Sequence, residues 1–418
     1  MQPVIADLPT SAGSRLARPC ISCGAEQHQR LYRNQLARIA GLDLSYDVVE
    51  CRTCGAVFAD QVAEQRDYTN YYVHCSKYDS IGSVEQVAAL DRRRAEFAVR
   101  FVQQATGSGP RVLDIGCGSG VLLAAFASAG WQELCGIDPA PNAAESALRL
   151  FGITGVRQGA VASVGEQFAL HEFDLLCLTA VLEHLMDPVE ILRSLASRMH
   201  PGAMLLVEVP ALERFAIQSL EPFGEFSIEH VNFFSYHSLV NTARRAGFRP
   251  MASAFLTLAP TSSDSLYVLF TVGGGEPTAA SAPQLVGDYI RLSDAALQPV
   301  IKRAIGALGP AGAVIWGAGS HSARLLPIID RLGLGAGVVA VIDSNPNLQG
   351  RSFGRHVVIA PDGLAAIPAA TVIVSSFRSS APIAAGIKAR FSNRVCELYA
   401  PRPAGWTGDP AGDSRGRT

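Results

Sequence analysis

RVLDIGCGSG, from Arg111 to Gly120, carries the strongest structural signal in this chain. A run of small apolar residues, typical of a buried strand, leads into alternating small turn residues. The acidic Asp138 then ends the next strand-like run, LCGIDP. In a parallel α/β sheet this layout places a glycine turn and a carboxylate at one edge, where a nucleoside cofactor lies across the strand ends. The stretch therefore predicts an α/β fold that binds such a cofactor.

The glycine spacing indicates which kind of cofactor this is. Gly116, Gly118 and Gly120 are evenly spaced, whereas a dinucleotide loop has its third glycine three residues after the second, where a helix receives a pyrophosphate. Asp114 stands two residues before the first glycine, where a phosphate would meet a carboxylate. A phosphate-free cofactor with an ammonium group, such as S-adenosylmethionine, tolerates that charge. The alternative is a glycine turn that only allows close packing.

The segment resembles motif I of the class I S-adenosylmethionine-dependent methyltransferases. FDLLCL (173–178), TAVLEHLMDP (179–188) and HPGAMLLVEVP (200–210) have counterparts in the same order in that superfamily, so the resemblance covers about 110 to 250. It implies that Asp138 accepts both ribose hydroxyls. The cofactor contacts expected from it also include Asp114, Gly116, Cys117, Gly118, Gly120, Pro139, Thr179 and Ala180.

Composition bounds the remaining possibilities. The chain has 418 residues, of which 48% are hydrophobic, so two or three domains with substantial cores are expected. A formal net charge of -2 means that the chain lacks the excess of basic residues typical of nucleic-acid-binding proteins. The first eighteen residues do not resemble a signal peptide, and charged residues interrupt each apolar run before it reaches a membrane-spanning length. We expect a cytoplasmic protein without a membrane partner.

Two CxxC pairs lie near the N-terminus. Cys20 and Cys23 form the first pair and Cys51 and Cys54 the second, with a glycine after each pair. Four thiolates complete a tetrahedral shell with no open position, so this spacing predicts a small zinc ribbon whose metal is structural. Disulfides or a redox dithiol are the alternatives, which a reducing cytosol disfavours. The other five cysteines are scattered and are expected to be small buried side chains.

An aromatic stretch, DYTNYYVHCSKYDS (67–80), follows the ribbon. It is too polar for a core strand and too aromatic for an idle linker. The tyrosines, including Tyr72 and Tyr78, could form a lid that carries phenol donors to a polar substrate. Alternatively, they are wedged between domains with their hydroxyls in water.

The second landmark is FGEFSIEHVNFFSYHSLVNTARRAGF (223–248). Glu229 and His230 are expected in a loop before a helix that Ser235 caps and Gly247 ends. A histidine near the transfer site can remove a proton from the atom being methylated, because imidazole titrates near neutral pH. His230 is therefore the candidate general base, with Glu229 beside it, unless both only brace the loop. His184, just past the fourth strand, is the rival base or a wall of the site.

The C-terminal third predicts a second nucleotide-binding-like fold. A linker at 273–284 precedes a helix that Pro299 should kink or split, and then AVIWGAGSHSARLLPIID and VVAVIDSNPNLQG read as strand, turn and helix units. Gly317 and Gly319 resemble a dinucleotide loop that lacks its third glycine, and Asp343 falls where a ribose-binding acid should be. A structural or substrate-nucleotide role is favoured over a bound nicotinamide dinucleotide. The last eighteen residues are too rich in proline, glycine and charge to expect order.

Together these parts resemble the sugar C-methyltransferases that act on nucleotide-linked 4-keto-deoxysugars. The resemblance implies that His230 removes the proton next to the ketone and that a cleft between the core and the last domain holds the nucleotide sugar. Tyr72, Tyr78, Ser227 and Asn232 are the expected substrate contacts. The family commonly has a tyrosine where this chain has Ser227, and a lysine soon after the glycine turn that GAGSHSARLL lacks, so the acceptor could differ.

The expected architecture is a doubly wound class I methyltransferase sheet flanked by the zinc ribbon and a Rossmann-like α/β domain. The predicted boundaries are a disordered 1–17, a zinc module at 18–66, the methyltransferase domain at 67–272, a linker helix and substrate domain at 273–400, and a disordered tail at 401–418. Transfer to oxygen or nitrogen of another polar molecule, a nicotinamide-dependent oxidoreductase and a non-catalytic binding module are the alternative functions. The sequence leaves the acceptor, the methylated atom and the oligomeric state open.

Overall fold

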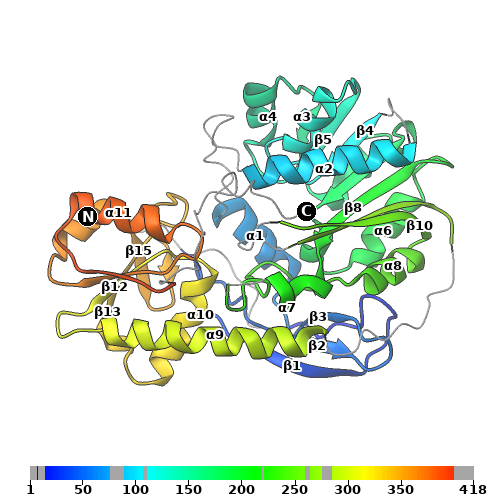
Figure 1. Ribbon diagram of the computed structural model, residues 1–418. Helices are drawn as coiled ribbons and strands as arrows, with labels where there is room; N and C mark the ends of the chain where they lie inside the picture. Colours follow the sequence, from blue (N-terminus) through cyan, green and yellow to red (C-terminus); the bar gives the residue numbers. More distant parts are fainter. Residues whose placement is uncertain are drawn as a thin grey trace, which may run out of the picture.

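The computed structural model describes residue 7 and residues 15–75, 89–106, 111–218, 221–258, 264–274 and 285–399. Tyr78 and the last eighteen residues, for which we predict a substrate contact and a disordered tail, lie outside the described residues. The described strands form three sheets, of four, seven and six strands (Figure 1). No helix in this part of the chain is long and apolar enough to cross a membrane.

The four-stranded sheet carries the CxxC pairs. Its strands are β1 (His28–Asn34), β2 (Tyr46–Cys51), β3 (Val57–Asp60) and β9 (Asn232–Phe233), in that order and antiparallel throughout. Strand β9 lies inside the predicted methyltransferase segment 67–272, yet it pairs with β3 and not with the larger sheet. The segment that follows His230 is therefore tied to the N-terminal unit.

Parts of the segment 1–17, predicted to be disordered, contact the fold. Leu16 forms an antiparallel bridge with Val62. The Asp7 carboxylate accepts hydrogen bonds from the amide of Ser352 at 3.2 Å and from its hydroxyl at 2.9 Å. These contacts reach both the N-terminal and the C-terminal unit, which the polar composition of the segment does not reveal.

The seven-stranded sheet has the order β10-β11-β8-β7-β4-β5-β6. β4 to β8 are parallel, and β11 runs antiparallel between β8 and β10. All four residues of β4 are buried, as expected for a parallel strand covered on both faces. The strands are β4 (Val112–Ile115), β5 (Leu134–Asp138), β6 (Val156–Gln158), β7 (Leu175–Thr179), β8 (Met204–Pro210), β10 (Phe248–Leu256) and β11 (Ser265–Val272).

Helices cover both faces of this sheet, which confirms the doubly wound α/β prediction. Buried residues of α2 (Ala89–Thr106), α3 (Val121–Ser128) and α4 (Ala143–Phe151) pack in one hydrophobic cluster on the sheet. Those of α6 (Pro188–Ala196) and α8 (Tyr236–Arg245) pack in another. The short helices α5 (Val164–Gln167) and α7 (Phe215–Gln218) lie in connections.

Helix α8 begins and ends as predicted. The Ser235 hydroxyl accepts from the amide of Ser238 at 3.2 Å, and the Ser238 hydroxyl accepts from the amide of Ser235 at 2.9 Å. Each hydroxyl satisfies an amide that the first turn leaves unpaired. Gly247, just after the helix, has a φ of +95°. The helix start that follows the His230 loop is thus fixed by local sequence.

The six-stranded sheet has the order β14-β15-β13-β12-β16-β17, with only β14 antiparallel to its neighbour. Helix α9 (Leu285–Ala307) contains Pro299 but is one helix, so the proline does not split it. The other helices are α10 (Ser320–Arg331) and α11 (Ser380–Arg390). The strands are β12 (Ala313–Trp316), β13 (Val338–Ile342), β14 (Ser352–Phe353), β15 (His356–Ile359), β16 (Thr371–Val374) and β17 (Val395–Glu397).

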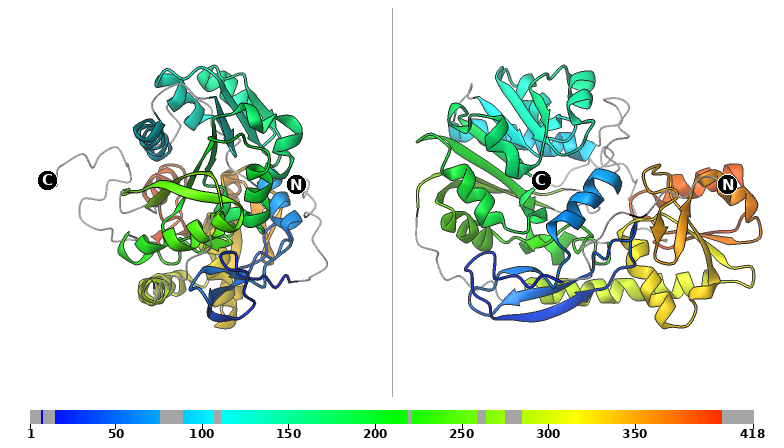
Figure 2. Two further views of the ribbon diagram at one scale, coloured as in Figure 1. Left: turned by 90° about the vertical axis from the view of Figure 1, so that its right-hand side faces the viewer. Right: turned by 180° about the vertical axis from the view of Figure 1, so that it is seen from behind.

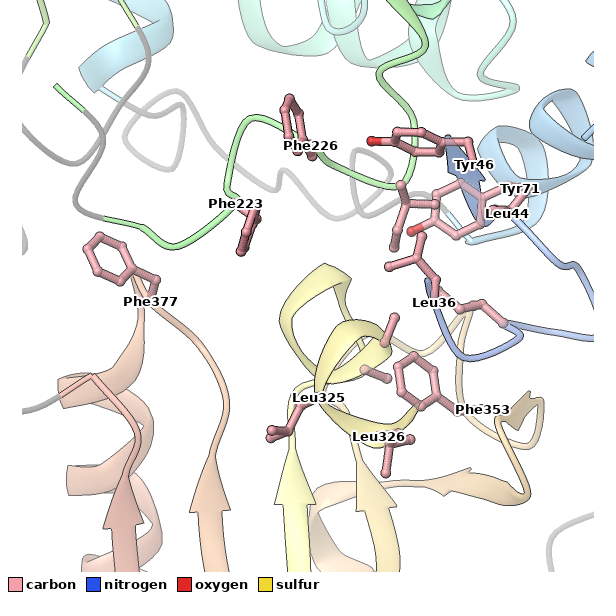
Figure 3. Packing of buried hydrophobic residues seen from close by; sticks show 14 of the residues in the cluster. Leu36, Leu44, Tyr46, Tyr71, Phe223, Phe226, Leu325, Leu326, Phe353 and Phe377 are labelled. Atoms are coloured by element: carbon pink, nitrogen blue, oxygen red, sulfur yellow. The ribbon is translucent and has the colours of Figure 1, made fainter. Parts of the chain in front are cut away.

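One hydrophobic cluster joins the three units. It contains Leu36 and Tyr46 from the N-terminal unit, Phe226 from the His230 loop, and Leu325 and Phe353 from the C-terminal unit (Figure 3). Figure 2 shows from behind how α9 runs from the C-terminal unit towards the four-stranded sheet. This shared core indicates that the three units fold onto one another.

Residues 67–75 of the aromatic stretch lie in helix α1 (Gln65–Cys75), which is placed centrally between the units (Figure 1). Tyr68 and Tyr71 are buried in the shared cluster. These two tyrosines are wedged between the units, as the second expectation has it, but the Tyr68 hydroxyl is buried and does not lie in water.

Candidate active site

The predicted cofactor loop lies at the carboxyl edge of β4 and β5. The amide of Gly116 donates to the carbonyl oxygen of Ile137 at 2.7 Å, which joins the loop to the neighbouring strand. The Asp138 carboxylate accepts from the amide of Gly118 at 2.7 Å and from that of Ala140 at 2.8 Å. The acid that ends β5 therefore holds the glycine turn, at the strand edge where the ribose of a nucleoside cofactor would bind.

Asp114 and the glycines fit a cofactor with a positive charge and no phosphate. The Asp114 Oδ1 atom is buried and has no hydrogen-bond partner among the described residues. Burial, followed by the nearby Asp138 carboxylate, raises the pKa of Asp114 to about 7. Gly118 has a φ of +50°, and a Cβ built on it would meet no described atom within 4 Å. A cofactor ammonium group could supply the missing partner of Asp114, above an open backbone surface.

Other predicted cofactor residues present their backbone. The Cys117 sulfur is buried against Gly136, where an added Cβ would lie 2.7 Å from it, so this side chain points into the fold. Ala180 adopts a positive φ of +54°, and its amide donates to the carbonyl oxygen of Glu208 at 3.0 Å. Thr179 ends β7, and the Pro139 carbonyl oxygen accepts from Gln158 at 3.3 Å.

His184 and His230 come together beyond the end of β7. Their ring centroids are 4.9 Å apart with an interplanar angle of 66°. His184 Nδ1 lies 2.5 Å from the Tyr72 hydroxyl and 3.1 Å from the Glu229 carbonyl oxygen. Because a carbonyl oxygen only accepts, the contact with Glu229 places the ring proton of His184 on Nδ1. Glu229 therefore contributes its backbone to this contact.

Both imidazoles are held neutral. Burial lowers the pKa of His184 to about 4. Burial and the neighbouring His184 lower the pKa of His230 well below its usual value. A neutral imidazole at physiological pH has a lone pair that can accept a proton, so the arrangement is competent for general-base chemistry.

A buried acid lies next to the two histidines and was not singled out from the sequence. Glu183 lies in the 3-10 turn Leu182–His184, and its Oε2 atom has no partner among the described residues. Burial and the nearby Glu208 raise the pKa of Glu183 well above its usual value. One ligand atom each of Glu183, His184 and His230 lie within 4.8 Å of one another, a set that could hold a divalent cation. Its place beside His184 in LEHL was the available sequence signal.

Two predicted substrate contacts are engaged inside the chain. The Ser227 hydroxyl accepts from the amide of His230 at 3.1 Å and from that of Glu229 at 3.3 Å. The Asn232 amide group donates to the carbonyl oxygens of Leu182 and Leu185, both at 2.7 Å, and its oxygen accepts from Arg18 at 2.8 Å. Asn232 is buried, so it braces the loop, and a substrate contact would have to replace one of these bonds.

The four cysteines of the two pairs converge. The sulfur atoms of Cys20 and Cys54 are 3.5 Å apart, those of Cys23 and Cys51 are 3.6 Å apart, and all four lie within 4.8 Å of one another. Tetrahedral zinc with Zn–S bonds of about 2.3 Å separates its sulfurs by about 3.8 Å. All four are free cysteines in the structure, so the donor set and its spacing fit a metal better than disulfides.

Comparison with known proteins identifies the type of domain that the seven-stranded sheet forms. A family model described as "Methyltransferase domain" matches residues 89–253. A ubiquinone biosynthesis O-methyltransferase of Bordetella avium is 34% identical over 168 residues, which are 36% of this chain and 68% of that protein. Its counterpart from Pseudoalteromonas translucida is 30% identical over 175 residues, 39% of this chain and 74% of that protein.

Solved structures match the same kind of domain. The N-methyltransferase NodS from Bradyrhizobium japonicum, in complex with S-adenosyl-L-homocysteine, has 18% sequence identity and a TM-score of 0.34, and the match covers 45% of this chain and 89% of that one. The family model and the curated relatives define an S-adenosylmethionine-dependent transferase of methyl groups. The chain belongs to the class I S-adenosylmethionine-dependent methyltransferases. This membership favours methyl transfer over the oxidoreductase and non-catalytic alternatives.

Proposed function

We propose that this methyltransferase transfers a methyl group to a carbon atom of a nucleotide-linked keto-deoxysugar, with His230 as the general base. The arrangement of Asp343 in the C-terminal unit carries the nucleotide part of this proposal. Its carboxylate accepts from the amide of Ala318 at 2.6 Å and from that of Asn345 at 2.7 Å. Asp138 holds its own glycine loop in the same way, so a second nucleoside-type edge is available for the acceptor.

His230 performs the first step of the proposed reaction. Its neutral imidazole takes the proton from the carbon next to the ketone, and the electron pair of the C–H bond forms an enolate. The enolate carbon then attacks the methyl group of S-adenosylmethionine, forming a C–C bond and breaking the S–C bond to give S-adenosylhomocysteine. Holding the enolate carbon, the methyl carbon and the sulfur atom in line accounts for most of the acceleration.

Tyr72 is the side chain that we propose for the developing enolate oxygen. Its hydroxyl oxygen lies beside His184 Nδ1, and its own proton can be donated to an oxyanion. Glu229 remains a proposed contributor from the loop before β9. Tyr78, outside the described residues, remains a proposed substrate contact.

We further propose that Cys20, Cys23, Cys51 and Cys54 bind a structural zinc ion. The sulfur spacing given above supports this. Strand β2 ends at Cys51, and β2 pairs with β3, which in turn pairs with β9. The ion would therefore stabilise the sheet that holds the segment after His230, and no bond of the transfer involves it.

A second candidate function is transfer to an oxygen atom. The curated relatives named above are ubiquinone biosynthesis O-methyltransferases, and the likeness to that of Bordetella avium covers 36% of this chain. In this case His230 would deprotonate a hydroxyl group of a phenolic ubiquinone precursor, and the acceptor would not need the C-terminal unit.

Isotope exchange separates the two candidates. The protein is incubated in heavy water with a nucleotide-linked 4-keto-deoxysugar and S-adenosylhomocysteine, and proton loss next to the ketone is followed by NMR. Carbon transfer requires deuterium uptake at that carbon, and ¹³C-methyl-labelled S-adenosylmethionine then places the label on carbon. A label on the oxygen of a phenolic acceptor, with no uptake into any keto-sugar, would overturn the proposal.

His237 supplies the matched control. It is an exposed histidine on α8, seven residues from His230. His230→Ala should lower exchange and transfer by about a hundredfold or more, while His237→Ala leaves both unchanged. Equal rates in both variants would move the base to another residue, with His184 next.

A further inference from the structure

The loop that carries His230 has little regular structure of its own. Between α7 and β9, the described residues 221–231 contain no helix or strand. The backbone groups of such a segment need partners from elsewhere when they are buried. Two buried arginines, one from the N-terminal unit and one from the C-terminal unit, supply several of these partners.

Arg324, on helix α10 of the C-terminal unit, holds the loop before His230. It is only 4% exposed. Its Nη2 atom donates to the carbonyl oxygens of Phe226 at 2.6 Å and of Phe223 at 3.2 Å. The guanidinium also contacts the Asn34 side chain, and its carbon lies 5.5 Å from the centre of the Phe223 ring. Phe223 adopts a φ of +54°, so Arg324 binds a backbone in a strained conformation.

Arg18, from the N-terminal unit, holds the loop after His230. Its Nη1 atom donates to the carbonyl oxygens of Val231 and Ala59, both at 3.0 Å. Its Nη2 atom donates to the Met186 carbonyl oxygen at 2.6 Å and to the Asn232 side chain at 2.8 Å. One side chain thereby joins β3, the segment that follows His184, and the residue next to His230.

Burying these two arginines has an energetic cost. A buried guanidinium loses its hydration, and replacing buried charges by apolar residues of similar volume is often neutral or stabilising. Burial lowers the pKa of Arg18 to about 10, which reflects this cost. The rigid fork of arginine can bind two carbonyl oxygens at once, a geometry that lysine cannot reproduce.

We propose that Arg324 and Arg18 are positioning residues that fix the backbone on either side of His230 and so place its imidazole for proton removal. This inference rests on the proposed role of His230 as the base. Phe226 lies four residues before His230 and Val231 one residue after it, and the Ser227 hydroxyl binds the His230 amide between them. Fixing the backbone on both sides of His230 defines the path of a loop that has no helix or strand hydrogen bonds of its own.

A double-mutant cycle with His230 tests this role. The full-length Arg324→Met variant is compared with the wild type for exchange and transfer rates, and the same change is then made in the His230→Ala background. We expect kcat to fall by about tenfold to a hundredfold, with little change in S-adenosylmethionine binding or acceptor KM, since a misplacement of about 1 Å costs that much. The effect should largely disappear in the His230→Ala background, because both changes act on one group.

Arg331→Met, on the same helix α10, is the control. Arg331 is exposed and its Nη1 atom donates to the Gln35 side chain at 3.1 Å. This variant should keep the wild-type kcat. If thermal unfolding shows that Arg324→Met does not fold, the same double-mutant cycle is carried out with Arg324→Lys. Lysine keeps the charge and approximate length of the side chain but lacks the planar fork of arginine.

The outcomes separate the two proposals. An equal loss from Arg324→Met in both backgrounds, or a wild-type kcat in both Arg324→Met and Arg18→Met, would overturn the positioning role. A wild-type rate in His230→Ala alone would instead overturn the proposed function of His230.

Discussion

The ring centroids of His184 and His230 lie 4.9 Å apart. The Tyr72 hydroxyl lies 2.5 Å from the Nδ1 atom of His184. A charge on His184 would oppose protonation of His230, which adds to the effect of burial in lowering the pKa of His230. The pair comes from two loops, one after β7 and one before β9, and only the fold brings them into contact.

The pH dependence of kcat/KM follows from this pair. Because burial and His184 lower the pKa of His230, the base is unprotonated at neutral pH and is lost only as pH falls below the ordinary imidazole range. With S-adenosylmethionine saturating, so that the titration of Asp114 does not contribute, we expect kcat/KM for the acceptor to be flat above about pH 6.5. His184→Gln should move the acidic limb to higher pH, whereas His237→Gln leaves it in place. An acidic limb centred on the ordinary histidine value in the wild type would contradict this.

Cofactor affinity should depend on the charge of Asp114. Its pKa of about 7 means that the carboxyl is mostly protonated at pH 5.5 and gains charge as pH rises towards 7. Over this range the cofactor α-amino group stays protonated. Calorimetry should show tighter S-adenosylmethionine binding as pH rises, with proton release. Asp114→Asn should bind weakly with no such dependence, and an identical slope in that variant would exclude Asp114 as the ammonium partner.

The two strand-end acids should have separable effects. Asp343→Ala should raise the acceptor KM by about tenfold or more and leave S-adenosylmethionine affinity unchanged, since a lost hydrogen bond to a charged group costs about 1.5–3 kcal/mol. Asp138→Ala should weaken cofactor binding and leave the affinity for the nucleotide alone unchanged. Each variant is the control for the other, and parallel losses in both constants would indicate general unfolding.

Metal content tests the cysteine site. Elemental analysis of the purified protein should give about one zinc per chain, because four thiolates fill one tetrahedral shell. Cys51→Ser should lose that metal and lower Tm, since binding of a structural metal is coupled to folding. Cys135→Ser, outside the cluster, should change neither quantity. Full metal content in Cys51→Ser would rule out Cys51 as a ligand.

The sequence predicts the framework of this protein well. The apolar run and glycine turn at Arg111 to Gly120 specify β4 and its loop through local backbone requirements, and Ser235 specifies the start of α8. The convergence of the two CxxC pairs also follows from residue spacing. In each case the local geometry requires a particular residue type, so a single sequence is enough to predict it.

The contacts that brace the site could not be predicted in the same way. Asn232 was expected to meet substrate but bonds to Leu182, Leu185 and Arg18, and these partners come near it only in the folded chain. A lone arginine such as Arg324 has no pattern around it that distinguishes a buried guanidinium from a solvated one. The chemistry at a position is visible in the sequence, whereas the identity of its long-range partners is not.

The two residues of β9 limit how this enzyme could be taken apart. Since Asn232 and Phe233 pair with Phe58 and Val57, a fragment cut at the predicted boundary of 67 would lose the strand beside its own catalytic loop. The methyltransferase segment is therefore not an interchangeable cassette. Grafting it onto the flanking units of a relative would require moving the N-terminal ribbon with it.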